Sequence, residues 1–244
     1  MIKVILFDLG NTLIYFDSSW SVVLAHANQI LVERLIGMGY NLEPKQFSKE
    51  FYHRIQAYYH QRNTEFIEYT TEKVLSRLLK EVGYPDIPSD KLRPALDAMY
   101  AISQAHWKPE EDAIPTLKNL IGSGYRLGLI SNAGDATDVH TLVDNANLRP
   151  FFEKIVISAA VGIRKPHSQI FKITLHFFDA SPQEAVMVGD TLDADILGAN
   201  NMGIPSIWIT RRVNLSENDK IPVSAQPTAT VKTLSEIPAL LATW

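Results

Sequence analysis

The fold of this chain is decided by the stretch Val4-Ile5-Leu6-Phe7-Asp8-Leu9-Gly10-Asn11-Thr12-Leu13. Its first four residues are apolar, and so short a run predicts a buried strand rather than a helix. Asp8 follows directly, and the chain then turns at Gly10. In an open α/β sheet, ligands bind at the carboxyl ends of the strands. Asp8 is therefore a candidate for chemistry, although an aspartate can also serve only to cap a turn.

The composition is typical of a soluble globular protein, with 46% hydrophobic and 20% charged residues among 244. The net charge of −4, without a basic run, gives no reason to expect nucleic acid as a partner. Cysteine is absent, which excludes disulfides, thiolate metal sites and a cysteine nucleophile. Without a signal-peptide pattern or an apolar run of roughly 18 residues, we expect a cytoplasmic protein with no membrane partner. The sequence makes no prediction of oligomeric state.

From about residue 20 to 105 the chain shows only helical patterns. Apolar residues recur at spacings of three and four, and glycines or prolines separate four such runs. The segment 15–19 before them is expected to be a hinge. We therefore predict an all-helical domain over residues 16–105, inserted into a core domain that comprises residues 1–15 and 106–244.

After residue 106, predicted helices and strands alternate. The strands are expected at 125–130, 154–158, 185–188, 205–209 and 228–231, with a last helix over 234–241 and a surface loop over 222–227. Such alternation predicts βαβ units and a parallel sheet. The first strand must join this sheet, because alone it could not pair its backbone groups. The predicted fold class is thus α/β, a doubly wound parallel sheet with an inserted helical domain.

A second acidic strand end lies at Gly189-Asp190, after an apolar run. Asp193 and Asp195 follow in the first turn of an expected helix, where the helix dipole favours carboxylates. Asp8 and Asp190 at neighbouring strand ends would repel each other unless a divalent cation lay between them. Mg²⁺ prefers oxygen ligands and typically uses one or two carboxylates together with water and a substrate phosphate. The sequence therefore predicts a Mg²⁺ site.

Two further strand ends carry polar groups. Ser131 and Asn132 stand at the entry to a helix, where they could bind an anion or simply cap the helix. Pro166 is expected at a helix start and would keep Lys165 in extended backbone outside it, so that its ammonium can reach a phosphoryl group. Arg164 or Lys165 could instead be a surface charge. Together the four strand ends suit attack on phosphorus, which depends on positioning and charge neutralisation.

These motifs resemble, in order, the four motifs of the haloacid dehalogenase-like (HAD) hydrolases. They are Phe-Asp-Leu-Gly-Asn-Thr-Leu from Phe7, Ile130-Ser131-Asn132, Arg164-Lys165-Pro166, and Val188-Gly189-Asp190-Thr191 with Asp195. The resemblance covers residues 1–15 and about 106–244. The helical insert is similar to the C1-type cap of that superfamily. The resemblance implies a Rossmannoid core and a Mg²⁺-dependent phosphatase of a small phosphorylated metabolite.

The resemblance also implies a role for each matching residue. Asp8 would be the nucleophile that forms an aspartyl-phosphate. Ser131 and Lys165 would hold the phosphoryl group, with Thr12 and Asn132 nearby as substrate-binding residues. The metal ligands would be Asp8, the backbone carbonyl of Gly10, Asp190 and, directly or through water, Asp195.

The chain departs from the pattern of most phosphatases of the superfamily at Gly10. They carry there an aspartate that protonates the leaving oxygen, and such general acid–base catalysis typically contributes about 10²–10⁴-fold. The first hypothesis is a phosphatase whose substrate needs no strong acid, or one to which a histidine of the insert (His26, His53 or His60) supplies the proton. The second is a 2-haloacid dehalogenase, which needs no metal and no proton for its halide. The third is a non-catalytic or weakly active member that binds a ligand.

Substrate choice is expected to lie in the insert, because such caps close over the site. A group of aromatic and basic residues there could bind a nucleotide or sugar phosphate, or could belong to the helical core: Tyr58, Tyr59, His60, Arg62 and Tyr69.

Overall fold

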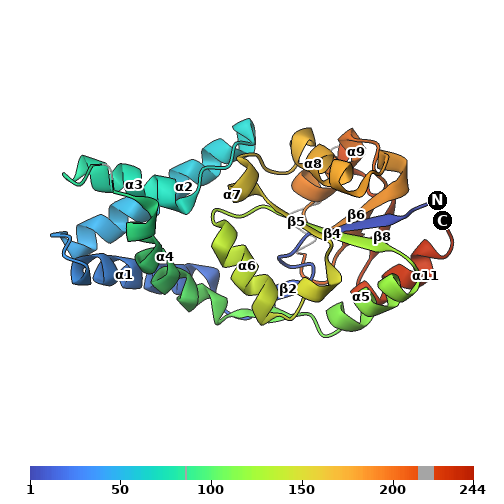
Figure 1. Cartoon of the computed structure of the whole chain (residues 1–244), viewed down its shortest axis with the longest axis horizontal. Helices are drawn as coiled ribbons and strands as arrows, with labels where there is room; N and C mark the ends of the chain where they lie inside the picture. Colours follow the sequence, from blue (N-terminus) through green and yellow to red (C-terminus); the bar gives the residue numbers. More distant parts are fainter. Residues whose placement is uncertain (86, 214–222) are drawn as a thin grey trace.

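In the computed structural model, which describes residues 1–85, 87–213 and 223–244, a six-stranded sheet forms the centre of the core (Figure 1). Its strands are β1 (Val4–Phe7), β4 (Arg126–Ser131), β5 (Lys154–Ile157), β6 (Ala185–Gly189), β7 (Ser206–Ile209) and β8 (Ala229–Val231). They pair in parallel in the order β5-β4-β1-β6-β7-β8. The predicted α/β class is therefore confirmed, and β1 lies inside the sheet.

Helices cover both faces of this sheet. One face carries α5 (Ala113–Gly122), α6 (Ala136–Asn145) and α11 (Ile237–Leu241), and the other carries α8 (Ser168–Phe178) and α9 (Leu197–Asn201). Side chains of a strand alternate between faces. Ile5 and Phe7 accordingly join the first hydrophobic cluster, and Val4 and Leu6 join the second. Because both faces are covered, β1 is apolar without interruption.

The insert is helical, as predicted. It consists of α1 (Trp20–Gly37), α2 (Pro44–Glu65), α3 (Thr71–Glu81) and α4 (Ser89–Gln104). These helices surround a hydrophobic cluster of their own, which includes Leu31, Phe51, Leu75 and Leu96. They lie beyond the carboxyl ends of the strands, at the left in Figure 1. The insert therefore faces the edge of the sheet where the candidate residues gather.

The expected hinge at 15–19 is wrong for its first two residues. Ile14–Phe16 form strand β2, which pairs antiparallel with β3 (Trp107–Pro109), where the chain leaves the insert. The rings of Phe16 and Trp107 meet at 5.2 Å between centroids. Strands of three residues are too short to show an alternating pattern, and their pairing joins segments about ninety positions apart.

Two helix boundaries also differ from the predictions. Pro166 precedes α8 by two residues instead of starting it, because His167 caps that helix by accepting a hydrogen bond at Nδ1 from the Gln169 backbone N–H (3.2 Å). The helix expected after Asp190 begins as a π-helical turn, η3 (Leu192–Ile196), before α9. The remaining short turns are α7 (Ser158–Val161), η1 (Arg149–Phe151), η2 (Pro182–Glu184), η4 (Val223–Ala225) and η5 (Leu234–Glu236). Pro222 of the expected loop lies outside the described residues.

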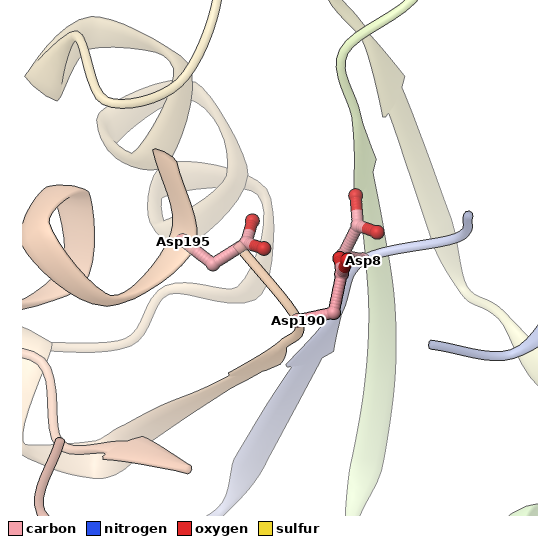
Figure 2. A group of neighbouring side chains, drawn as sticks. All are labelled: Asp8, Asp190 and Asp195. Atoms are coloured by element: carbon pink, nitrogen blue, oxygen red, sulfur yellow. The ribbon is translucent and has the colours of Figure 1, made fainter. Parts of the chain in front are cut away.

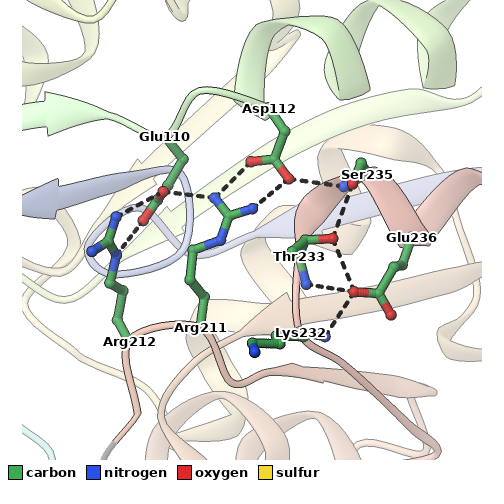
Figure 3. Close-up of polar contacts among 8 residues, drawn as sticks. All are labelled: Glu110, Asp112, Arg211, Arg212, Lys232, Thr233, Ser235 and Glu236. Carbon is green, nitrogen blue, oxygen red and sulfur yellow. Dashed lines mark hydrogen bonds and ion pairs between the residues drawn. The ribbon is translucent and has the colours of Figure 1, made fainter.

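A polar network joins the exit of the insert to the C-terminal part of the chain (Figure 3). Arg211, after β7, donates to Glu110 (2.6 Å) and to both oxygens of Asp112 (2.8 and 2.7 Å). Arg212 donates to the buried carboxylate of Glu110, and the Ser235 backbone N–H donates to Asp112. Bidentate arginine–carboxylate pairs of this kind fix geometry as well as charge. They anchor the segment after β3 on the core.

Several expectations concern properties that the fold does not decide. No helix in the described ranges combines the length and apolar character needed to cross a membrane. The cytoplasmic location, the absence of a nucleic-acid partner and the domain boundaries at 15/16 and 105/106 stay predictions.

Candidate active site

The predicted strand ends converge at one edge of the sheet. Phe7 at the end of β1 is in register with Leu129 of β4 on one side and Val188 of β6 on the other. This places Asp8 between Ser131 and Asp190, as expected for the carboxyl ends of neighbouring parallel strands. One cavity of about 790 Å³ is lined by these residues together with Gly10, Asn132, Lys165 and Asp195. Of the site residues predicted from the sequence, all except Thr12 therefore line one cavity.

Lys165 is the centre of this site. Its side chain is buried, and its ammonium Nζ lies 2.6 Å from Asp8 Oδ1, 2.7 Å from Asp195 Oδ1 and 2.7 Å from the Ile130 carbonyl oxygen. Burial acts to lower the pKa of Lys165, but the charges of Asp195 and Asp8 outweigh it and raise the pKa above its usual value. Lys165 therefore stays protonated and is no surface charge.

Asn132 holds the backbone of Lys165. Its side-chain Nδ2 donates to the Lys165 carbonyl oxygen (2.9 Å), and its Oδ1 accepts from the Lys165 N–H (2.8 Å). Ser131 is buried and lines the cavity. Thr12 is fully buried, is not among the lining residues, and its Oγ1 has no hydrogen-bond partner in the described part of the chain. Of these three residues, Asn132 is thus the one that positions the backbone of Lys165, through its two hydrogen bonds.

Three carboxylates form an acidic cluster beside this lysine. Asp8, Asp190 and Asp195 each place one oxygen within 4.8 Å of the others, and Figure 2 shows Asp195 pointing across toward the other two. Burial, followed by the charges of Asp8 and Asp195, raises the pKa of Asp190 to about 8. Burial also raises the pKa of Asp195 to about 6 against the influence of Lys165. Three carboxylates against one ammonium suit a divalent cation with oxygen ligands. Asp193, by contrast, is exposed and lies outside the cluster.

Gly189 makes this cluster possible. A Cβ atom at this position would lie 2.3 Å from the carboxyl group of Asp195, far inside contact distance. Asp195 Oδ2 in turn accepts a hydrogen bond from the Thr191 N–H (3.0 Å). Trp208 Nε1 donates to the Asp190 carbonyl oxygen (2.8 Å). The turn after β6 is thus held so that both aspartates approach the end of β1.

The surroundings of Gly10 are aromatic. A Cβ atom there would meet the Trp107 ring at 3.4 Å, an ordinary van der Waals contact. His26, His53 and His60 are exposed, and the cavity lining does not include them. In this arrangement, these three histidines are therefore not placed to protonate the leaving group.

Two residues at or near the site were not predicted from the sequence. Trp107 lines the cavity, and Glu68 lies beside Arg164. Glu68 is buried, accepts from Ser158 Oγ (2.7 Å) and forms an ion pair with Arg164 (3.2 Å). A charged residue between Ile67 and Tyr69, in a link between helices, carries no periodic signal, so only its contacts identify it.

The chain resembles known proteins in sequence and in fold. A family model for haloacid dehalogenase-like hydrolases matches residues 2–203. The chain is 31% identical over 212 residues to the glyceraldehyde 3-phosphate phosphatase of Methanopyrus kandleri, covering 86% of this chain and 85% of that protein. Its fold is similar to a 2-haloacid dehalogenase from Pseudomonas syringae pv. Tomato DC3000 (TM-score 0.69, 24% identity, 100% of both chains). It is also similar to a HAD phosphatase from Thermococcus onnurineus (TM-score 0.64, 21% identity, 98% of both chains). At these identities the two structures show the fold alone.

Proposed function

The chain belongs to the haloacid dehalogenase-like hydrolases, and from this membership we propose that it is a Mg²⁺-dependent phosphatase of a small phosphorylated metabolite. The observation that carries the proposal is the contact of Asp8 Oδ1 with the buried ammonium of Lys165 at 2.6 Å. This contact uses Oδ1 of Asp8, so that Oδ2 is available to attack phosphorus. It also places the Lys165 ammonium where it can neutralise the charge of the phosphoryl group. The relative from Methanopyrus kandleri is named as a phosphatase, and this supports phosphate-ester hydrolysis as the reaction.

The reaction proceeds in two displacements at phosphorus. An oxygen of Asp8 attacks, the new bond forms to phosphorus, and the bond to the ester oxygen breaks with its electron pair. The leaving oxygen takes a proton from water. A second water then attacks the aspartyl-phosphate, which releases phosphate and restores the Asp8 carboxylate. Lys165 and the Ser131 hydroxyl neutralise and orient the phosphoryl oxygens throughout, which is what this chemistry chiefly requires.

Asp8, Asp190 and the backbone carbonyl of Gly10 would hold Mg²⁺, with Asp195 directly or through water. When bound, the ion supplies charge neutralisation for the transferring phosphoryl group. The excess of carboxylates over cations in the cluster supports this assignment. Asn132 belongs to the substrate-binding loops in this proposal, whereas Thr12, which is buried and does not line the cavity, is assigned no contact with the substrate.

The domain division belongs to the same proposal. Residues 1–15 and 106–244 form the catalytic core, and residues 16–105 form a C1-type helical cap over it. The separate hydrophobic cluster of the insert and its position opposite the strand ends support this division. Such a cap excludes water and contributes contacts to the substrate.

A 2-haloacid dehalogenase remains the alternative that Gly10 favours, since a halide leaves without a proton. It would use Asp8 as nucleophile without a metal. The acidic cluster of Asp8, Asp190 and Asp195 favours the phosphatase, because three clustered carboxylates suit a divalent cation, which the dehalogenase reaction would not use.

Release of phosphate from p-nitrophenyl phosphate, with Mg²⁺ and with EDTA, tests the proposal. We expect turnover that depends on Mg²⁺ and a loss of at least about 10³-fold in the Asp8→Asn variant, because the nucleophile is removed. Asp179→Asn is the matched control, since Asp179 is exposed, lies far along the chain in α8's C-cap, and has a left-handed backbone that asparagine tolerates. Equal rates in wild type and Asp8→Asn would overturn the phosphatase function.

A further inference from the structure

Two arginines line the same cavity as Asp8 but take no part in the proposed phosphoryl chemistry. Arg62 belongs to α2 of the insert, and Arg164 precedes Lys165 in the core. The guanidinium carbon of Arg62 lies 3.8 Å from the centroid of the Tyr59 ring. The insert and the core thus each present one guanidinium to a shared cavity.

Arg164 is buried and Arg62 is half-buried, and each has one buried guanidinium nitrogen without a hydrogen-bond partner in the described part of the chain. Arg164 is only 9% exposed, and its Nη1 lies 3.2 Å from Glu68 Oε2 as an ion pair but has no hydrogen-bond partner among residues 1–85, 87–213 and 223–244. The Nε atom of Arg62 is buried and has no hydrogen-bond partner among the described residues. A buried polar group without a partner costs free energy, and a buried cation costs more.

Local charges leave a positive excess. Among the described residues, Glu68 forms the ion pair with Arg164, and it also accepts hydrogen bonds from Tyr58 (2.5 Å) and Ser158 (2.7 Å). Within this group of residues, the single negative charge of Glu68, which already faces three donors, is therefore shared between two positively charged guanidinium groups. Burial, and after it the charge of Arg164, lower the pKa of Arg62, and the charge of Glu68 acts in the opposite direction without compensating them.

We propose that Arg62 and Arg164 bind a second anionic group of the substrate, so that the substrate is a phosphate monoester with a carboxylate or another phosphate at its far end. The inference rests on the proposed phosphatase function. The planar guanidinium matches both kinds of anion through paired hydrogen bonds. Lys165 and Ser131 then hold the phosphoryl group that reacts, while the two arginines select the molecule that carries it.

Paired substrates that differ in the second anion test this inference. One pair is 3-phosphoglycerate and glyceraldehyde 3-phosphate, which share a carbon skeleton and differ in a carboxylate. The other pair is fructose 1,6-bisphosphate and fructose 6-phosphate, which differ in a phosphate. We expect kcat/KM to favour the member with two anions by about 10- to 100-fold in at least one pair, the range of a charged hydrogen bond. The pair that responds identifies the anion.

The Arg62→Gln variant should bring that ratio down toward one, whereas Arg62→Lys should keep part of it because the charge remains. Arg54→Gln is the matched control, since Arg54 lies on the same helix, pairs with Glu81 and does not line the cavity. Its ratio should equal that of the wild type. The thermal transition of each variant shows whether it folds.

A ratio near one in both pairs for the wild type would overturn the inference, as would a ratio unchanged by Arg62→Gln. Dissociation constants of the same four compounds for the Asp8→Asn variant, measured by calorimetry, give the ratio without turnover. Absence of phosphate release from every substrate, including p-nitrophenyl phosphate, would instead count against the phosphatase function, and the binding ratio would still decide the inference.

Discussion

Gly10 is the residue that most limits the chemistry of this site. The position two residues after the nucleophile carries no acid, and the nearest side chain to a Cβ there is the apolar ring of Trp107. A leaving group that needs no proton, such as an aryl, acyl or anomeric oxygen, is therefore favoured over a simple alkoxide. At 3.4 Å from this ring, a Cβ atom fits at ordinary van der Waals distance.

Replacing this glycine by aspartate tests the point. We expect Gly10→Asp to raise kcat/KM for glycerol 1-phosphate about 10-fold or more relative to p-nitrophenyl phosphate, because a general acid helps only a poor leaving group. Gly10→Asn, with the same shape but no acid, is the matched control. An equal response of both substrates to Gly10→Asp would contradict this explanation of the missing acid.

At the scale of elements, the contact between α4 and α6 includes a titratable group whose pKa is shifted, the carboxyl group of Asp138. Gln104, the last residue of α4, donates to Asp138 Oδ1 (2.8 Å), and Arg93 pairs with Asp135 at the N-cap of α6 (2.7 Å). Burial raises the pKa of Asp138 to about 7, with Gln104 and Arg93 opposing and Asp135 adding to the rise. The protonated form of Asp138 is thus favoured in the folded protein.

This shift predicts how stability depends on pH. The folded pKa of about 7 exceeds the unfolded value of about 3.9, so between these values the folded state binds more protons, and stability falls as pH rises. Above about pH 7 the loss is complete. Between pH 5 and pH 8, the free energy of unfolding of Asp138→Asn should therefore rise by about 2–3 kcal/mol relative to that of the wild type.

Urea unfolding at the two pH values measures this difference. Asp144→Asn is the matched control on the same helix, because Asp144 is exposed and its pKa is lowered by the hydrogen bond from Arg149, so it does not titrate in this range. Parallel pH profiles of wild type and Asp138→Asn would contradict the prediction.

At the scale of the whole molecule, Glu68 joins the insert to the core. It accepts hydrogen bonds from Tyr58 of α2 and from Ser158 of α7, and Ser158 Oγ accepts from the Ala133 N–H (2.9 Å) beside the Ser131 loop. Its pairing with Arg164 reaches the residue before Lys165. One buried carboxylate thus connects the link between α2 and α3 to two of the four motif loops.

Removing its charge should loosen this connection. We expect Glu68→Gln to lower the free energy of unfolding by about 1–3 kcal/mol, because charge-assisted hydrogen bonds of a buried group are lost. Glu65→Gln, at an exposed position of α2 bonded only to Gln61 among the described residues, is the matched control. Urea unfolding curves give the comparison, and equal midpoints for both variants would contradict the assigned role of Glu68.

Much of this architecture could be predicted from the sequence, because its signals are local. Alternating apolar runs and helical periodicities predicted the parallel sheet, and buried runs that end in Asp8 and Asp190 predicted where the polar residues meet. The order of the four motifs then indicated the family. Strand β3 (Trp107–Pro109) was not predicted, because three residues are too few to show a periodic pattern.

What the sequence by itself determined is therefore the class of fold, the family and the edge of the sheet where Asp8, Ser131, Lys165 and Asp190 gather, since neighbouring residues and their spacing encode these. Only the tertiary structure decided that Asn132 binds the backbone of Lys165, that Gly189 admits the carboxylate of Asp195, and that Arg62 and Arg164 face one cavity. These contacts join positions distant along the chain, and their strength depends on burial and on charge balance. No local pattern contains that information, because desolvation and pairing arise only when the chain is folded.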